Sequence, residues 1–570
     1  MLTPRCALLI LLFFLPIAST WDPSRAATSY YFSASGSDSN NCRSLASPCR
    51  TIGKMNSLTY AAGDSILFHG GDSFTGCVMI NSRNVPNKGS ASNPITVDSY
   101  DSGNATLLSN CPGNLHALLT IDGVSGVTVQ NLILSANGTQ TAIGILIQNS
   151  IAGNTVDMVT IQNNDISGFN ISRASNYGAE VFVSGFATNG NCGALNNIKV
   201  LNNKLHGAFG ATSPDDNGIT GHGCGQNITN VRYSGNEVYH IGGHATAPSG
   251  TSGNGILATG VAGGELSYNL VHDNGANTNT CGGPAGVWAY RSDHIIIQFN
   301  EVYNMRPVPD QGVGCDWAAY DLDEGVTNSI VQYNYSRNNA GAAWLVYNAA
   351  GPNTIRYNVS ENDDAYLKNG GIAALNAGTF PLSFYNNTMF SPVVNTGTDN
   401  VQACFTFGFT GTFPVGTVIA NNICSNSMVN RFGAAFFANA AVGVDTSAIN
   451  FTHNLYENNS GGPLWQLDGV LYHSLAEIQA AGKEAGSIVA NPMLTNAGAG
   501  GTCTWTPTIA NGPQPCPSVY RLRPGSPALG VGANLTATPY NLDIGTRDYF
   551  GNTLGTSINV GADGGKQPRS

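Results

Sequence analysis

The sequence is poor in charged residues, which make up only 10% of its 570 residues. Its 23 Lys and Arg residues are outnumbered by 34 Asp and Glu residues, for a formal net charge of −11, and they are scattered along the chain. A nucleic-acid-binding protein needs a basic stripe to neutralise phosphates, and this chain has none. The same shortage of cations disfavours a strongly anionic polymer as partner, although a local cationic groove would override the net charge.

Long apolar runs are missing outside the N-terminus. Arg5, the apolar run over 7–17 and the small residues over 18–27 predict a signal peptide over 1–27. That run is too short to span a bilayer, and no later run approaches the roughly 20 apolar residues that a membrane helix needs. We therefore expect a secreted, extracellular or periplasmic monomer with no membrane span.

Cysteine is scarce, with 13 residues, and removal of Cys6 with the signal peptide leaves an even number. In an oxidising compartment this favours disulfides over metal sites or free thiols. The order of the cysteines favours sequential pairing without fixing it. The predicted bridges are Cys42–Cys49, Cys77–Cys111, Cys192–Cys224, Cys281–Cys315, Cys404–Cys424 and Cys503–Cys516.

What the chain has in abundance is glycine, with 70 residues, and a repeated unit of β-type apolar residues followed by asparagine. Successive asparagines of this unit are 24 to 39 residues apart, which suits one coil of stacked strands rather than a domain. The apolar residues alternate at period two, which favours strands over helical repeats. The repeat asparagines are Asn131, Asn164, Asn203, Asn236, Asn269, Asn300, Asn334, Asn358, Asn387, Asn422 and Asn454.

In a coil of parallel strands, we expect each repeat asparagine to turn the chain in left-handed backbone geometry. Its side-chain amide can hydrogen-bond the asparagine of the next coil. Cysteines about one repeat apart would lie on neighbouring coils, about 4.8 Å apart along the stack, where a disulfide can form. Both patterns predict an all-β solenoid.

The repeats and both chain ends resemble the pectate-lyase-like superfamily of right-handed parallel β-helices. The segment 30–33 is similar to the entrance cap of those proteins, and 520–528 and 547–552 are similar to their closing segment. The resemblance implies a single-stranded right-handed parallel β-helix with caps at both ends. We expect an N-terminal cap and first coils over 28–110, a central helix over 111–460, and C-terminal coils with a closing segment over 461–570.

The strand before each repeat aligns from coil to coil over 255–259, 286–290, 319–323, 343–347 and 371–375. Period two divides each strand into an inner and an outer face. The apolar face, expected inside, carries Ile256, Ala258, Val287, Ala289, Tyr320, Leu322, Trp344, Val346, Ile372 and Ala374. The predicted outer face carries Trp288, Tyr290, Asp321, Asp323, Leu345 and Tyr347.

This outer face combines aromatic rings, which can pack on the C–H faces of sugars, with carboxylates that can act as acid and base. Asp321 and Asp323 are two residues apart on one strand, which permits either carboxyl separation known for glycosidases. Close like charges raise one of the two pKa values, leaving one acid protonated and one ionised. Asp316 and Glu324 flank the pair as alternates. A solvated acidic turn or a Ca²⁺ site is the competing interpretation.

The turns add further candidates for substrate binding. His240 and His272 fall in polar columns that could border the outer face, and Arg291 and Lys368 are the cations best placed to reach substrate. Each is equally well explained as a turn or surface residue.

The stretch from Asp316 to Asp321, followed by Gly325 and Asn328, is similar to the active coil of family 9 polysaccharide lyases. The resemblance implies that Asp316 is a calcium ligand. It fails at two points, because Asp321 stands where that family has its catalytic lysine and 339–341 replaces its calcium-binding aspartate pair.

A lyase of this fold commonly uses Lys, Arg or His as its base, whereas a hydrolase needs an acid and an ionised carboxylate. The sequence therefore predicts a glycoside hydrolase that cleaves an extracellular polysaccharide and requires no cofactor. The predicted machinery is Asp321 and Asp323 as acid/base pair, Asp316 in support, and Trp288, Tyr290 and Tyr347 as sugar platforms. The alternatives are a non-catalytic glycan-binding or adhesion solenoid and a lyase that acts through Arg291, Lys368, His240 or His272.

Overall fold

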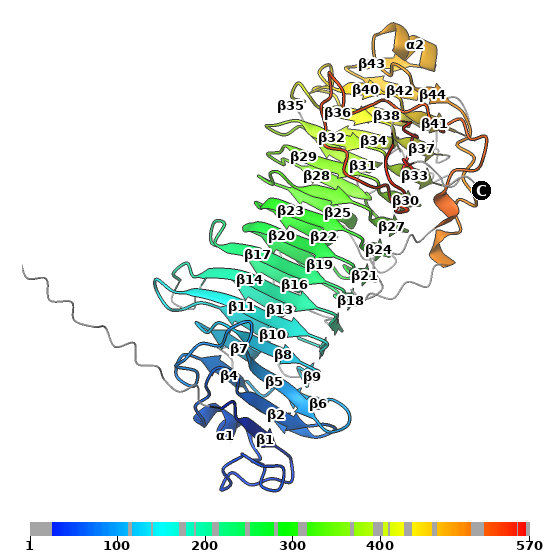
Figure 1. Ribbon diagram of the computed structural model, residues 1–570. Coiled ribbons are helices and arrows are strands. Elements are labelled where there is room, and N and C mark those ends of the chain that lie inside the picture. The colour runs from blue at the N-terminus through cyan, green and yellow to red at the C-terminus, as the bar shows by residue number, and fades with distance from the viewer. Residues whose placement is uncertain are drawn as a thin grey trace, which may run out of the picture.

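The computed structural model describes residues 26–565 apart from several gaps (Figure 1). The gaps are 112–116, 138–140, 170–177, 187–189, 208–215, 245–250, 279–282, 306–315, 365–369, 392–402, 409–410, 427–435, 459–463, 503–517 and 556. The predicted signal peptide up to residue 25, Lys368, Cys281–Cys315 and Cys503–Cys516 therefore lie outside the described residues.

Three long sheets of 14 strands run the length of the molecule, and the chain visits them in turn. Sheet A consists of β1 (Ser29–Phe32), β2 (Ser65–His69), β5 (Ile95–Tyr100), β8 (Val127–Gln130), β11 (Thr155–Gln162), β14 (Ala194–Leu201), β17 (Ile228–Ser234), β20 (Val261–Ser267), β23 (Asp293–Gln298), β26 (Ile330–Gln332), β29 (Asn353–Arg356), β32 (Leu382–Tyr385), β36 (Val418–Ala420) and β40 (Asn450–Thr452). Sheet B consists of β3 (Ser73–Thr75), β6 (Ala105–Leu108), β9 (Leu132–Ser135), β12 (Asp165–Ser167), β15 (Lys204–His206), β18 (Glu237–Tyr239), β21 (Leu270–His272), β24 (Glu301–Tyr303), β27 (Tyr335–Arg337), β30 (Val359–Glu361), β33 (Thr388–Ser391), β37 (Ile423–Asn426), β41 (Leu455–Glu457) and β44 (Ile488–Val489). Sheet C consists of β4 (Val78–Asn81), β7 (Ala117–Asp122), β10 (Ile143–Gln148), β13 (Gly178–Ser184), β16 (Asp216–His222), β19 (Ser252–Thr259), β22 (Ala285–Tyr290), β25 (Ala318–Asp323), β28 (Trp344–Tyr347), β31 (Gly371–Asn376), β34 (Ala403–Gly408), β38 (Phe436–Ala440), β42 (Leu464–Leu467) and β43 (Val470–Tyr472).

Neighbouring strands pair in parallel except at the last pair of sheet C, so the predicted right-handed parallel β-helix is confirmed. The inner face of sheet C stacks Ile256, Val287, Tyr320 and Trp344 in register, as predicted. One strand departs from the prediction. Trp344 pairs with Ala373 rather than Ile372, so Ala373 and Leu375 join the buried Ile372 in the core while Ala374 packs outside with Leu345.

The asparagine ladder is confirmed from Asn164 to Asn454 along the turns between sheets A and B. Within it, the Asn300 amide Nδ2 donates to Asn334 Oδ1 at 3.0 Å, and Asn269 Nδ2 donates to Asn300 Oδ1 at 2.9 Å. The predicted left-handed backbone is wrong for these residues, because it belongs to the preceding position, as at Phe299 and Tyr333. Asn131 occupies that preceding position, where its amide donates to Asp98, and it is not a rung of the ladder.

Four predicted disulfides are confirmed. They are Cys42–Cys49, Cys77–Cys111, Cys192–Cys224 and Cys404–Cys424. The Cys77 and Cys111 Cα atoms are 5.5 Å apart although the residues are 34 positions apart in sequence. This bridge therefore joins neighbouring coils.

The two ends are covered differently. Helix α1 (Ile52–Ser57) begins after the Thr51 cap and buries Ile52 and Met55 at the first coils. At the other end, β43 turns back antiparallel to β42 and leads into α2 (Leu475–Ala480). These six-residue helices leave no described helix long and apolar enough to cross a membrane.

The predicted closing segment lies along the side of the coils rather than over their end (Figure 1). Arg547 stacks over Phe299 and Tyr333, and Asn421 Oδ1 accepts from the Ala533 amide at 2.8 Å. The segment thus covers the aromatic turns between sheets A and B, where Tyr333, Tyr357 and Tyr520 form a second apolar cluster.

Candidate active site

Sheet C brings the predicted acids and aromatic residues together on its outer face. In the register of β22, β25 and β28, Asp321 lies between Trp288 and Leu345. Asp323 lies between Tyr290 and Tyr347 in the same way. Because the side chains of a strand alternate, both acids point away from the core that holds Tyr320 and Leu322. The predicted outward orientation is confirmed.

Asp321 is nevertheless a buried acid, with only 1% of its surface exposed. No described residue hydrogen-bonds its Oδ1 atom. Burial raises the pKa of Asp321 well above its usual range, and the charges of Asp323 and Asp316 add to that rise. A carboxyl in these surroundings holds its proton.

Asp323 is partly exposed and is the last residue of β25. The backbone N–H of Glu324 donates to its Oδ1 at 2.6 Å. Burial, together with the charges of Asp316 and Glu324, raises the pKa of Asp323 to about 7. This value suits a group that exchanges a proton near neutral pH.

Asp316 completes a group of three carboxyls. It lies just before β25, is partly exposed, and accepts a hydrogen bond at 2.8 Å from the Gly283 backbone N–H. Its charge raises the pKa of both Asp321 and Asp323, which places the three acids in one electrostatic unit.

Glu324 ties the turn after Asp323 to the neighbouring coil. Its Oε2 accepts from the Tyr290 hydroxyl at 2.8 Å and from Arg291 at 2.7 Å. Arg291 is 64% exposed and also stacks over the Tyr290 ring at 4.8 Å. Burial and the bond to Glu324 raise the pKa of Tyr290 to about 12. Arg291, Tyr290 and Glu324 thus form a fixed polar rim beside Asp323.

The prediction that Trp288 is an open sugar platform is wrong for this structure. Its ring is 2% exposed and packs with Leu257 and Ala285. Tyr290 and Tyr347 are partly exposed and remain available as platforms. Alternation along a strand predicts which face of the sheet a residue lies on, but not what packs over that face. The apolar residues Phe182, Leu257 and Leu345 on the outer face indicate that part of it is buried.

His272 and His240 lie on or after strands of sheet B, and the acids lie on sheet C. The His272 ring stacks between Tyr239 and Tyr303 with centroids 5.1 and 4.7 Å away. Burial opposes its protonation, but hydrogen bonds to Asp273 and Glu237 raise the pKa of His272. The structure does not bring these histidines together with the acids.

The positions of the lyase calcium pair have a structural role here. Asn339 is buried, and its amide donates to Val302 and to Asp363 Oδ1 in a second side-chain ladder. Among the described residues, no group of three His, Cys, Asp or Glu side chains is arranged to hold a metal ion. Calcium binding at Asp316 stays a prediction.

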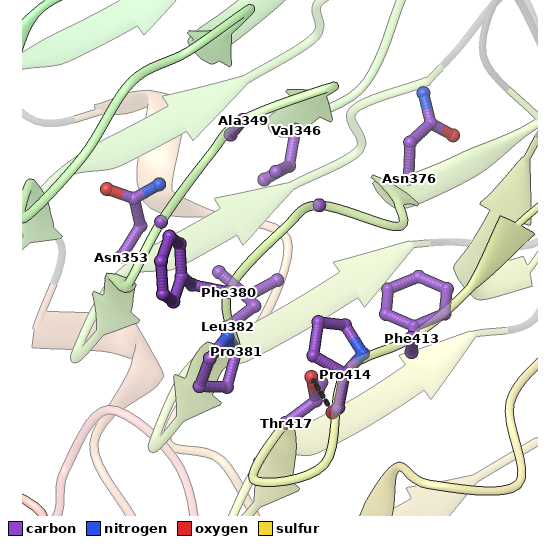
Figure 2. Close-up of a pocket in the computed structure, with 12 residues that line it drawn as sticks. Val346, Ala349, Asn353, Asn376, Phe380, Pro381, Leu382, Phe413, Pro414 and Thr417 are labelled. Atoms are coloured by element: carbon purple, nitrogen blue, oxygen red, sulfur yellow. Dashed lines mark hydrogen bonds between the residues drawn. The ribbon is translucent and has the colours of Figure 1, made fainter.

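A hollow on the turns between sheets C and A lies further along the stack (Figure 2). Phe380, Leu382 and Asn376 line it, and Phe380 is half-exposed. Its cavity volume is only about 10 Å³, which is room for about one water molecule. It cannot enclose a sugar.

No family model matches the chain. Over 191 residues it is 31% identical to a lacto-N-biosidase of Bifidobacterium longum subsp. longum, a match that covers 33% of this chain and 11% of that protein. The GH136 lacto-N-biosidase structure of Eubacterium ramulus has a TM-score of 0.43 at 18% identity, over 67% of this chain and 64% of that one. Pectate lyase Pel9A has a TM-score of 0.46 at 13% identity, over 94% and 96% of the two chains.

The chain thus spans about a tenth of the length of the curated relative that it matches. The aligned segment, which is 33% of this chain, is related to a carbohydrate-active enzyme. Its three parallel sheets and stacked coils show that it is a right-handed parallel β-helix.

Proposed function

We propose that this chain is a secreted glycoside hydrolase that cleaves a polysaccharide at the outer face of sheet C. The observation that carries the proposal is the carboxyl group of Asp323, which is accessible, lies between two tyrosines and has a pKa raised to about 7. The four disulfides support an oxidising compartment and therefore secretion.

The exposure of the three acids suggests how they divide the reaction. Asp323 reaches substrate and, with its near-neutral pKa, protonates the glycosidic oxygen as the general acid. Asp316 is the other partly exposed carboxyl and supplies the base or nucleophile that glycoside hydrolysis requires. Asp321 is too buried to touch a sugar and acts as a positioning residue whose retained proton limits the charge beside Asp323.

The rim fits substrate binding better than elimination chemistry. Tyr347 offers ring surface to a sugar beside Asp323, and Tyr290 offers the ring face that Arg291 leaves uncovered. Arg291, a candidate base for a lyase, is committed to Glu324 and to the Tyr290 ring. The relationship to a lacto-N-biosidase over a third of the chain also favours hydrolysis.

Single substitutions test this division of roles. We expect Asp323→Asn and Asp316→Asn each to lower kcat by about 10²–10⁴-fold, which is the usual contribution of acid–base groups. Asp321→Asn keeps the shape of the buried group, so its loss of kcat should be smaller. Turnover of a polysaccharide panel, measured with thermal melts to confirm folding, gives these values.

Glu265→Gln is the matched control. Glu265 lies on the outer face of sheet A, where it accepts from Gln298, and its change should leave kcat within about twofold. Wild-type kcat in folded Asp323→Asn would reject the assignment of the acid.

A further inference from the structure

A second cavity lies on the outer face of sheet B, on a different sheet from the three acids. Its volume of about 450 Å³ is within the range of small-molecule sites. It opens between the turns after β27 and β30 and the C-terminal stretch 497–501. Its lining includes Asn338, Glu361, Asn362, Phe390, Gly498 and Gly501.

Buried hydrogen bonds hold the walls of this cavity in place. Glu361 is 7% exposed, and its Oε2 accepts from the hydroxyls of Tyr335 and Tyr520, each at 2.8 Å. The Gly500 backbone N–H donates to the same oxygen at 3.0 Å. The C-terminal stretch is therefore pinned to sheet B, and a ligand would enter a preformed site at little cost in ordering.

Two asparagine side chains leave complementary hydrogen-bonding groups unused. Asn362 Nδ2 donates to Asn338 Oδ1 at 2.8 Å. Among the described residues, nothing donates to the buried Asn362 Oδ1, and Asn338 Nδ2 finds no acceptor. A sugar hydroxyl both donates and accepts, so hydroxyls of a sugar can pair with the free acceptor and with the free donor.

The rest of the lining selects for an uncharged ligand with an apolar face. No cation occurs among the described lining residues, and the carboxylate of Glu361 disfavours anions. Nearby Arg337 is committed to Glu301 at 3.1 Å and stacks over Tyr303 at 3.8 Å. The Phe390 ring is partly exposed, and a side chain at Gly498 would come within 3.3 Å of its edge. Glycine there leaves the ring accessible.

We propose that this cavity is an accessory site that binds a unit of a neutral, hydroxyl-rich sugar. The sugar packs a C–H face on Phe390 and exchanges hydrogen bonds with Asn362 Oδ1 and Asn338 Nδ2. Binding here is independent of the acids on sheet C. For a long glycan, a second attachment point raises the effective concentration of the chain at the enzyme.

Binding measurements on the full chain carrying Asp323→Asn test the site without turnover. The probes are glucose, galactose, xylose and N-acetylglucosamine, with galacturonate as the anionic comparison, by saturation-transfer NMR and calorimetry. We expect at least one neutral sugar to bind, and galacturonate to bind at least tenfold more weakly. Asn362→Gly and Phe390→Leu should each weaken that binding at least tenfold or remove one site from the stoichiometry.

Asn230→Gly is the control, because Asn230 is another turn asparagine with positive φ whose amide bonds a neighbouring coil. It should bind as the parent does. Phe390 packs near Tyr520, so Phe390→Leu could disturb the fold as well as the cavity. If it lowers the melting temperature, the binding result for Asn362→Gly alone tests the proposal. The proposal is overturned if no neutral sugar binds, if galacturonate binds best, or if Asn362→Gly binds as tightly as the parent.

Discussion

At the scale of single residues, Asp323 owes its behaviour to its neighbours rather than to its own chemistry. A solvated aspartate has a pKa of about 3.9, and burial beside Asp316 and Glu324 raises the pKa of Asp323 to about 7. The role proposed for it depends on that rise, because a general acid must be protonated when substrate arrives.

The pH dependence of cleavage follows from this protonation. As pH rises through about 7, Asp323 loses the proton that it must donate, so kcat/KM should fall on the basic side. Glu324→Gln removes a charge that raises the pKa of Asp323 and should move this limb to lower pH. Arg291→Gln removes a charge that lowers the pKa and should move it to higher pH, each by less than about one unit.

Initial rates at low substrate concentration between pH 4 and 9 measure the position of the limb. A limb that stays in place in both variants, or moves the same way in both, would show that Asp323 does not control it.

The buried acid Asp321 should also make stability depend on pH. The pKa of Asp321 in the folded chain is raised above its value in the unfolded chain. Its favourable contribution to the free energy of unfolding is therefore complete below about pH 4 and is lost as the pH rises towards the folded pKa. Asp321→Asn cannot ionise and avoids this loss. We expect Asp321→Asn to gain stability over wild type, by about 1–3 kcal/mol, between pH 4 and pH 8.

Denaturant unfolding at the two pH values gives this difference, and Glu265→Gln serves as the surface control. A gap between Asp321→Asn and wild type that is the same at pH 4 and pH 8 would mean that Asp321 is not a buried titrating acid.

The sequence predicts the membership of the acid cluster better than its exposure. Alternation places Asp321, Asp323, Trp288 and Tyr347 on one face, and the structure confirms that face. It does not predict that Leu257 and Ala285 pack on Trp288 or that Asp321 is fully buried, because burial depends on contacts that the period of a strand does not encode.

At the scale of the element, the asparagine ladder stabilises the coils through buried polar bonds. Asn300 donates to Leu266 O at 2.9 Å and to Asn334, and its Oδ1 accepts from the backbone and side chain of Asn269. Each rung thus satisfies polar groups of three coils at once. A buried network of this kind is costly to break at any point.

Removal of one rung tests this role. Asn300→Ala leaves the partners of Asn300 buried and unsatisfied, so it should lower the free energy of unfolding by about 2–5 kcal/mol. Asn304→Gly is the comparison, because the side chain of this turn residue makes one hydrogen bond, to Asp273, and the loss of that bond should cost less than about 1 kcal/mol.

Denaturant melts with hydrogen exchange of β23 and β24 give both values. Equal losses in the two variants would contradict a special role for the ladder.

The repeat predicts the rungs because each needs an asparagine, but it assigns the turn to the wrong residue. The left-handed position precedes the rung and is filled by Asn163, Tyr268, Phe299 or His453, so no residue type marks it in the sequence. The register of β31 is missed for a similar reason. Both Ile372 and Ala373 are apolar and both are buried in the core, so the sequence does not show that Ala373 is the residue that pairs with Trp344.

At the scale of the whole molecule, regular spacing makes the fold predictable and irregular loops make it less so. One coil buries its apolar face only against the next, so the repeat alone specifies the stack. The C-terminal stretch carries no repeat, and its path along Phe299, Tyr333 and Asn421 could not be read from sequence. The accessory cavity depends on that path and was therefore missed.

For the protein as a whole, the first question to test is which reaction it catalyses. Hydrolysis adds one water across each cleaved bond, whereas elimination adds none and leaves an unsaturated sugar. The most direct measurement is product mass spectrometry after digestion of a polysaccharide panel in H₂¹⁸O, together with absorbance in the near ultraviolet. We predict one ¹⁸O atom for each bond cleaved, carried by the fragment with the new reducing end, no absorbance from unsaturated ends, and at least about 10²-fold less product with Asp323→Asn. Unsaturated products without ¹⁸O, formed equally by wild type and Asp323→Asn, would contradict hydrolysis by the acids of sheet C.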